Sequence, residues 1–351
     1  MHLQPFVKLA DPARYVACAM DLSVDHDARQ HWVRFFRKNF DTILKLGVDA
    51  AAARGESREA ATDRAKSCRA EFDEIFDAYT ASPSAAGRVT MLTIDAWRDD
   101  TLRKHGFTDA FIDLKHRENE RALPLLPAVC RQIDALRGAD QLRAVIEGVF
   151  AGNIFDMGSE ATAAAYLHGG PDFFATRASL SPRPWLIDDY DALQRRLLNR
   201  PIHRKAVFFI DNAGSDFLLG VAPLARWLAM RGTRVVLAAN QTPALNDMTI
   251  ADVNEWWPRI VEIEPSLKSL PIDRVSTGTA EPLIDLTGVS RELNEASADA
   301  DLVILEGMGR GIESNLDARF SCAALNIAMI KDAMTAKQLG GKLYDVVCRF
   351  R

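Results

Sequence analysis

Apolar residues recur at helical spacing through the first part of the chain, up to about residue 148. The clearest stripe includes Trp32, Phe36 and Phe40, which fall on one face of a helix. Strand-like alternation is lacking in this part of the sequence, so residues 1–150 are predicted to form an all-α bundle or cap. The predicted helices are 27–46, 50–79, 91–105, 109–123, 125–136 and 141–150.

From about residue 205 the pattern changes to an alternation of short apolar runs and amphipathic segments. Strands are predicted at 206–211, 233–239, 272–275, 301–306 and 342–349. Helices are predicted at 217–231, 247–257, 289–298 and 323–339. This alternation predicts a mainly parallel sheet with helices on both faces, a three-layer αβα architecture in an α/β domain that spans residues 151–351.

Charge and composition exclude several classes of protein. The 351 residues carry a formal net charge of -5, which argues against a nucleic-acid-binding surface. No apolar run is long enough to cross a bilayer, and residues 1–17 lack the apolar core of a signal peptide, so we expect a cytoplasmic protein. The five cysteines are scattered along the chain and are expected to be reduced thiols. The seven histidines are dispersed, so a zinc site is not expected.

Polar residues follow three of the predicted strands. The first strand ends at Asp211 and Asn212, the second leads through a loop to Asp247, and the third ends at Glu306. Ligands of open α/β sheets bind at the carboxyl ends of the strands, so these side chains are expected to converge. Oxygen ligands of this kind suit a hard divalent cation that keeps positions open for phosphate. Taken singly, Asp247 also fits a helix N-cap and Asn212 a tight turn.

The segment Gly307-Met308-Gly309-Arg310 departs from the nucleotide-binding fingerprints. Its G-x-G-x-G spacing is neither the dinucleotide pattern nor a P-loop, but its backbone N–H groups suit an anion. Arg310 could bind phosphate in a bidentate manner or lie on the surface. Lys331, in the predicted helix 323–339, could reach solvent or neutralise phosphate. The spacing around Asn153 and Asp156 favours a turn with an N-cap over a wall of the site.

Several strings resemble the metal-dependent damage-control phosphatase family, formerly a domain of unknown function. They are Asp211-Asn212-Ala213-Gly214, Pro243-Ala244-Leu245-Asn246-Asp247, Glu306-Gly307-Met308-Gly309-Arg310, Gly152-Asn153-Ile154-Phe155-Asp156 and Leu339-Gly340-Gly341-Lys342. The Glu-Gly-Met-Gly-Arg string resembles the branch that contains the phosphatase domain of pantothenate kinase homologues and free-standing plant proteins.

The resemblance implies a Rossmann-like αβα domain below the helical part, and a small phosphorylated metabolite as substrate. It implies a divalent metal (Mn²⁺, Co²⁺ or Ni²⁺, with Mg²⁺ as an alternative) bound by Asp211, Asn212 and Asp247. Asp211, Asp247 and Lys331 would act in catalysis, and Lys331 would also bind phosphate. The pocket would be shaped by Asn153, Asn246, Glu306, Gly307, Met308, Gly309 and Arg310.

The implied substrates are phosphopantetheine and its oxidised or damaged forms. A non-catalytic phosphometabolite-binding regulator is the alternative, followed by a carboxyl methyltransferase that uses S-adenosylmethionine. The pattern leaves open the physiological substrate, the native metal, the oligomeric state and the choice between an aspartyl-phosphate and direct attack by water.

Overall fold

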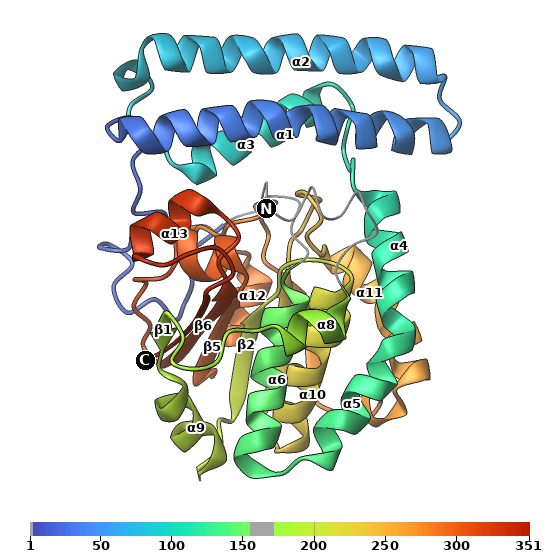
Figure 1. The fold of residues 1–351 in the computed structure, drawn as a ribbon, viewed down its shortest axis with the longest axis vertical. Helices are drawn as coiled ribbons and strands as arrows, with labels where there is room; N and C mark the ends of the chain where they lie inside the picture. The colour runs from blue at the N-terminus through green and yellow to red at the C-terminus, as the bar shows by residue number, and fades with distance from the viewer. Residues whose placement is uncertain (1–2, 155–171, 200) are drawn as a thin grey trace.

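The computed structural model describes residues 3–154, 172–199 and 201–351 and consists of a helical layer above an α/β body (Figure 1). The helical layer comprises α1 (His26–Ala53), α2 (Arg58–Ala81) and α3 (Met91–Lys104). The Asp25 side chain accepts a hydrogen bond from Ala28 N and so caps α1. The predicted segment 50–79 is interrupted between α1 and α2, where Ser57 caps the second helix.

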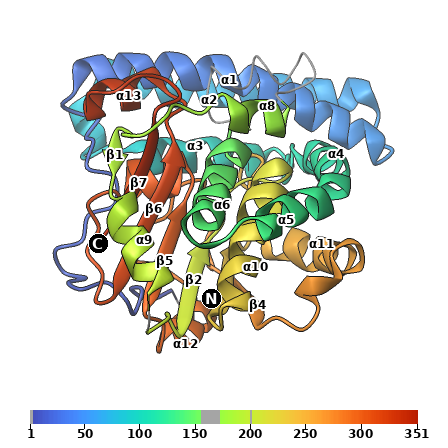
Figure 2. The ribbon, with the colours of Figure 1, turned by 60° about the horizontal axis from the view of Figure 1, so that its bottom comes forward.

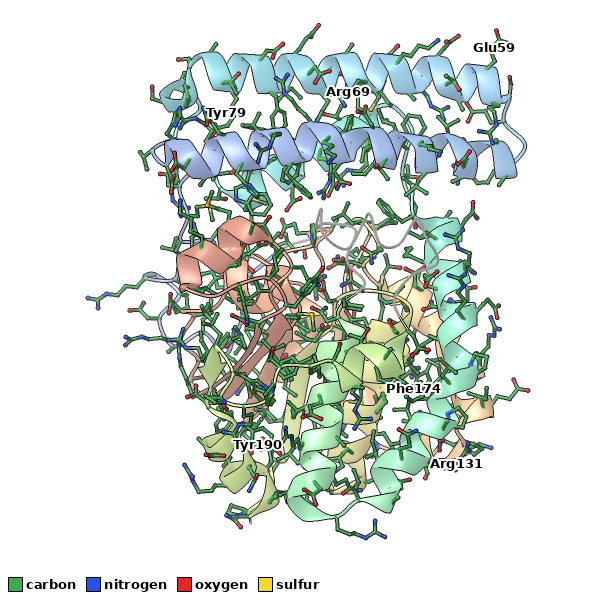
Figure 3. The ribbon with its side chains drawn as sticks, in the orientation of Figure 1. Glu59, Arg69, Tyr79, Arg131, Phe174 and Tyr190 are labelled. Atoms are coloured by element: carbon green, nitrogen blue, oxygen red, sulfur yellow. The ribbon has the colours of Figure 1, made fainter. Side chains whose placement is uncertain are left out.

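The apolar stripe of α1 packs against α2, as its spacing predicts. The rings of Phe40 and Phe72 stack with centroids 3.8 Å apart, and both side chains are fully buried. Glu59 points away from the outer face of α2, whereas Tyr79 is buried in the core of the helical layer (Figure 3). The helical layer therefore has its own hydrophobic core.

Two further helices, α4 (Ile112–Ala122) and α5 (Leu126–Ala135), lead from this layer down the side of the body, and α6 (Gly138–Gly152) runs back up along it (Figure 1). The helices predicted in this region are confirmed, although their ends differ by a few residues. α5 and α6 share one hydrophobic cluster with the sheet. The division of the chain at residue 150 stays a prediction.

The body is built on a seven-stranded sheet with the order β1-β7-β6-β5-β2-β3-β4. The strands are β1 (Ile187–Asp188), β2 (Lys205–Phe209), β3 (Arg234–Ala239), β4 (Ile272–Ser276), β5 (Leu302–Glu306), β6 (Ala323–Met329) and β7 (Val346–Phe350). From β6 to β4 all neighbours are parallel, whereas β7 is antiparallel to β6. The predicted mainly parallel sheet is confirmed.

Helices cover both faces of this sheet, and the side chains of β2 alternate between the two covers. Phe208 packs in a cluster with α6, α10 and α11, whereas Phe209 packs in a second cluster with Phe6 and α12 (Figure 2). The remaining helices are α8 (Phe173–Ala178), α9 (Tyr190–Leu198), α10 (Ala222–Met230), α11 (Ile250–Ile263), α12 (Arg291–Ser297) and α13 (Ala333–Leu339). The result is the expected three-layer αβα arrangement.

The predicted helix 323–339 is wrong, because its first half is strand β6 and only its second half is helix α13. The alanine-rich strand is paired on both sides, with β5 and β7, and this pairing outweighs its local preference. The polar residue in it, Asn326, is buried with its amide donating to Gly311 O and Asn315 O. Lys331 consequently follows a strand end.

The predicted helix 217–231 begins as a π-helical segment, Asp216–Val221, before α10. A second π-helical segment, Met308–Ser314, follows β5. Such segments are rare and occur often at functional sites. The two π-helical segments follow β2 and β5, at whose ends the polar residues were expected to meet.

Two further expectations from the sequence concern the cysteines and the possibility of a membrane-spanning helix. Cys18, Cys68, Cys130 and Cys348 are buried, and Cys322 is partly buried. None of the helices among the described residues has both the length and the apolar character needed to cross a bilayer.

Candidate active site at four neighbouring strand ends

Four adjacent parallel strands, in the order β6, β5, β2 and β3, bring their carboxyl ends to one edge of the sheet. Lys331 follows β6, Glu306 ends β5, Asp211 follows β2, and the loop after β3 carries Asp247. All four residues are at least 96% buried, with exposed fractions of 1%, 0%, 4% and 2%. The sequence predicted this convergence for three of the strands and missed β6.

Backbone pairing holds the loops after β2 and β3 together. Asn212 and Asp247 form an isolated antiparallel bridge, with Met248 N donating to Asp211 O at 2.9 Å. Ala213 N donates to Asn246 O at 2.9 Å. The helix after this loop begins at Ile250 with Thr249 as its N-cap, so the alternative role of Asp247 as a helix cap is wrong.

Arg310 links the two acidic strand ends. Its Nη2 donates to Asp247 Oδ2 at 2.7 Å, and its Nη1 donates to Asp211 Oδ1. Asn240 donates to the same Asp247 oxygen at 3.1 Å and accepts from Arg310 Nη2. The guanidinium is only 1% exposed, which contradicts the surface alternative for this residue. Despite the burial, the carboxylates of Asp247 and Asp211 raise the pKa of Arg310, so it stays charged.

Asn153 lies at the centre of the remaining polar groups. It is the C-cap of α6, and its Nδ2 lies 2.8 Å from Asp216 Oδ2, 2.8 Å from Glu306 Oε1 and 3.1 Å from Asp211 Oδ2. Its main-chain and side-chain oxygens both accept from Lys331 Nζ, at 2.7 and 2.9 Å. Asn153 lies in a turn, and its side-chain contacts also place it at the wall of the site, the alternative that the spacing disfavoured. The predicted N-cap and Asp156 lie outside the described residues.

Asp211, Asp216 and Glu306 form a buried acidic trio, each offering an oxygen within 4.8 Å of the others. Burial raises the pKa of each carboxyl group above its ordinary value, well above it for Asp211 and Glu306. Asn212 supports the trio by donating its amide to Asp211 Oδ2 at 2.9 Å and to Asp216 Oδ2 at 3.1 Å. Ionised carboxylates packed this closely require compensation by positive charge.

The charge balance and one unpaired oxygen fit a divalent cation. Four carboxyl groups (Asp211, Asp216, Asp247 and Glu306) face two cations (Arg310 and Lys331), which leaves a formal charge of −2 when all are ionised. Asp216 Oδ1 is buried without a hydrogen-bond partner among the residues that the structure describes. Carboxylate and amide oxygens without thiolates or imidazoles are the ligands of hard metals.

Gly307 allows the loop after β5 to pass close to Asp211. Its φ is +93°, and a Cβ placed there would lie 2.1 Å from Asp211 Oδ2. Only glycine fits both the backbone conformation and the contact. Gly307 therefore allows the ends of β5 and β2 to approach each other closely.

A small cavity of about 40 Å³ lies where the helical layer meets these strand ends. Asp211, Asp247, Met308 and Gly309 line it from the body, whereas Asp216, Glu306 and Lys331 do not line it. Its other walls comprise Trp32, Phe35, Phe36, Met91, Asp95, Arg98, Leu245, Pro282, Leu283 and Glu313. The two acidic strand ends thus face a space shared with the helical layer.

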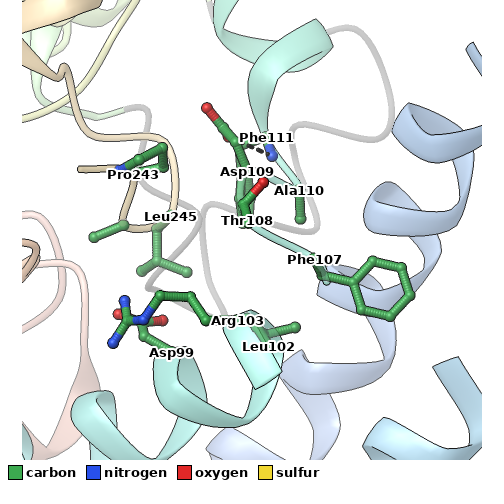
Figure 4. Close-up of a pocket in the computed structure, with 11 residues that line it drawn as sticks. Asp99, Leu102, Arg103, Phe107, Thr108, Asp109, Ala110, Phe111, Pro243 and Leu245 are labelled. Carbon is green, nitrogen blue, oxygen red and sulfur yellow. Dashed lines mark hydrogen bonds between the residues drawn. The ribbon is translucent and has the colours of Figure 1, made fainter. Parts of the chain in front are cut away.

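The loop before Asp247 is anchored in the helical layer. Leu245 adopts φ +48° and is buried with Leu283 in the hydrophobic core of that layer. A second, neighbouring pocket separates the loop from α3 and the connection to α4, with Pro243 and Leu245 on one side and Asp99 and Arg103 on the other (Figure 4). A left-handed conformation in a leucine is strained, and the surrounding packing maintains it.

Asp216, Asn240, Asp95 and Arg98 belong to the site or its cavity, but the sequence assigned them no role. Asp216 precedes an apolar helical stretch, where an acid is common. Asn240 directly follows β3, so the strand-end rule that identified Asp211 could have found it. Asp95 and Arg98 come from the helical layer, where the sequence pattern predicts a helix and gives no sign of a functional role.

Comparison with known proteins gives a consistent assignment. A family model described as the damage-control phosphatase ARMT1-like domain matches residues 36–347. A damage-control phosphatase of Arabidopsis thaliana is 43% identical over 257 residues, which cover 72% of this chain and 70% of the relative. Pantothenate kinase 2 of the same plant is 36% identical over 100% of this chain, and the 4′-phosphopantetheine phosphatase of Mus musculus is 32% identical over 97%.

The chain spans 42% of the length of that kinase and 48% of the mouse protein. Among solved structures, a DUF89 family protein from Pyrococcus horikoshii aligns with a TM-score of 0.62 and 18% identity. The alignment covers 89% of this chain and 96% of the other, and it supports the fold.

Proposed function

The chain belongs to the family of damage-control phosphatase ARMT1-like domains, and from this we propose that it is a metal-dependent phosphomonoesterase. The observation that carries the proposal is the meeting of four strand ends, which gathers four carboxyl groups and two cations beside one cavity. Phosphoryl transfer depends mainly on positioning and on stabilising negative charge, and this group of side chains can do both.

Asp211, Asn212 and Asp247 are the proposed metal ligands. Asp211 and Asp247 line the cavity that a phosphate would enter, whereas Asp216 and Glu306 are 0% exposed and do not line it. A divalent ion, with Mn²⁺, Co²⁺ or Ni²⁺ ahead of Mg²⁺, supplies Lewis acid chemistry and charge neutralisation there. The rival ligand set is the acidic trio of Asp211, Asp216 and Glu306.

The cationic and amide side chains have distinct roles in this proposal. Lys331 does not line the cavity, and it supplies positive charge to the site through Asn153, which accepts from its ammonium. Arg310 keeps Asp211 and Asp247 paired until the substrate arrives. Glu306 accepts from Asp211 N at 2.9 Å and fixes the start of the loop that carries the proposed ligands. Asn153 holds the acidic trio in place.

Two chemical routes fit these residues. In the first, Asp211 or Asp247 attacks phosphorus, the ester P–O bond breaks and the alcohol leaves with a proton; water then hydrolyses the aspartyl-phosphate to free the carboxylate and inorganic phosphate. In the second, water attacks phosphorus while a carboxylate takes its proton, and the ester P–O bond breaks to release the alcohol and inorganic phosphate. Beryllium fluoride trapped on one aspartate would favour the first route.

Phosphopantetheine and its oxidised or damaged forms are the proposed substrates, in keeping with the name of the mouse relative. The apolar and aromatic side chains that line the cavity beside Asp211 suit contact with the organic part of a phosphate ester.

The test is hydrolysis of p-nitrophenyl phosphate and 4′-phosphopantetheine with Mn²⁺, Co²⁺, Ni²⁺ or Mg²⁺, with EDTA as the control. Turnover that requires a metal and is lost in Asp247→Asn supports the proposal. Turnover that persists in EDTA, or that no metal supports, contradicts it, and the latter result would favour a phosphometabolite-binding regulator.

A further inference from the structure

Two residues that line the cavity each carry a polar atom that is buried without a hydrogen-bond partner within residues 3–154, 172–199 and 201–351. The two atoms are the indole N–H of Trp32 in α1 and the Oδ2 of Asp95 in α3. The two side chains are 1% and 3% exposed. One is a donor and the other an acceptor, and both residues line the cavity that Asp211 and Asp247 also line.

Leaving such groups unpaired is costly, because a buried polar group without a partner loses its hydrogen bonds to water. The other carboxylate oxygen of Asp95 accepts from Arg98, whose guanidinium also pairs with Asp99. Arg98 therefore fixes the Asp95 side chain while leaving Oδ2 available. Burial also raises the pKa of Asp95 to about 7, as expected for a carboxylate whose environment lacks full compensation.

The rest of the wall contributed by the helical layer consists of Phe35, Phe36 and Met91, together with Arg98, which is paired with Asp95 and Asp99. The ring of Phe35 lies edge-on to Trp32 with centroids 5.6 Å apart, and Phe36 follows at 6.4 Å from the same ring. An unpaired donor and an unpaired acceptor beside apolar side chains are the features that orient a ligand and set its specificity.

We propose that Trp32 and Asp95 are specificity-determining residues that bind a neutral polar group, an amide or a hydroxyl, in the organic part of the phosphomonoester. This inference rests on the proposed phosphatase function and deepens it. An amide or a hydroxyl has both an acceptor for the indole N–H and a donor for the carboxylate. A substrate without such a group leaves both protein atoms unpaired, which is the basis of strong discrimination in enzymes.

The experiment compares kcat/KM for 4′-phosphopantetheine, which carries amides and a hydroxyl, with kcat/KM for p-nitrophenyl phosphate, which carries neither. Measurements use Mn²⁺ and the full chain as wild type, Trp32→Phe and Asp95→Asn. The ratio of the two values is expected to fall by roughly tenfold or more in each variant, the size of one lost hydrogen bond to a buried partner. Glycerol 3-phosphate, with hydroxyls and no amide, shows which of the two groups is recognised.

Two matched variants control for loss of a tryptophan and of a buried charge. Trp256→Phe alters another tryptophan that is 1% exposed and does not line the cavity, and Asp99→Asn alters the second carboxylate partner of Arg98. Both should keep the wild-type ratio. A ratio unchanged in both Trp32→Phe and Asp95→Asn, or lowered equally in the controls, overturns the inference alone.

Measurements on the wild-type protein distinguish failure of this inference from failure of the proposed phosphatase function. Hydrolysis of p-nitrophenyl phosphate without hydrolysis of phosphopantetheine or glycerol 3-phosphate overturns the inference and leaves the phosphatase proposal standing. If no metal supports hydrolysis of p-nitrophenyl phosphate or of the other two esters, the inference and the phosphatase proposal are both contradicted.

Discussion

The ammonium of Lys331 lies 2.7 Å from the main-chain oxygen of Asn153, although 178 residues separate them in the sequence. Asn153 ends the last helix before the described chain is interrupted, and Lys331 follows the strand β6. The same Asn153 side chain donates to three carboxylates from two other segments. This contact ties the cationic side of the site to its acidic side.

Substitution of Lys331→Met should lower kcat/KM for phosphomonoesters by roughly 100-fold, because a charge-assisted contact of about 2–3 kcal/mol is lost. Steady-state kinetics and inhibition by inorganic phosphate would measure this effect. Lys337→Met in α13 is the control, since that lysine has a side chain that is 71% exposed. Equal activity of the two variants would remove Lys331 from the site.

Gly307→Ala should reduce turnover by two or more orders of magnitude, because its Cβ would displace the Asp211 carboxylate. Gly340→Ala is the matched control. It also has a positive φ, at +69°, but nothing lies within 4 Å of its added Cβ. Both variants should lose about 1 kcal/mol of stability in urea from backbone strain. If Gly340→Ala lost as much activity as Gly307→Ala, strain rather than the clash would be responsible.

Metal binding distinguishes the two ligand sets without any substrate. Saturating Mn²⁺ or Ni²⁺ should raise the melting temperature of the wild type by about 5 °C, since a ligand at 100 times its Kd contributes about 2.7 kcal/mol. Asp247→Asn should abolish the shift and Asp216→Asn should retain most of it. The opposite result would identify Asp211, Asp216 and Glu306 as the ligands.

Asp95 should make stability depend on pH. Burial raises its pKa from the ordinary 3.8 to about 7, so the folded protein binds the proton more tightly than the unfolded chain. The favourable contribution of the protonated group is present below about pH 4 and is lost as the pH rises through 7, by at most about 4 kcal/mol. Relative to wild type, Asp95→Asn should therefore gain unfolding free energy between pH 5 and 8 in urea titrations. A difference constant with pH would contradict this.

The sequence predicts the strand ends of β2, β3 and β5 because each apolar run stops abruptly at a polar residue. It fails at β6, whose alanines and central asparagine resemble the helix that follows. The strand forms because β5 and β7 lie on both sides of it, and Asn326 finds partners in Gly311 and Asn315. Tertiary pairing of this kind is invisible in a local pattern.

The family resemblance supplied what spacing alone did not, namely the involvement of Asn153 in the site. Neither approach identified Asp216, because an acid before an apolar helix is an ordinary helix start. Trp32 and Asp95 were missed for a different reason. They lie on apolar or amphipathic helices, and only the packing of the helical layer on the body brings them to the cavity.

The burial of Leu245 and Leu283 in the core of the helical layer limits how this protein could diversify. Exchange of the entire helical layer for that of a distant homologue would remove the side chains that pack around both leucines. The loop that holds Asp247 would then lose its anchor. New substrate preferences would then arise more readily from single replacements along the inner faces of α1 and α3 than from the recombination of whole modules.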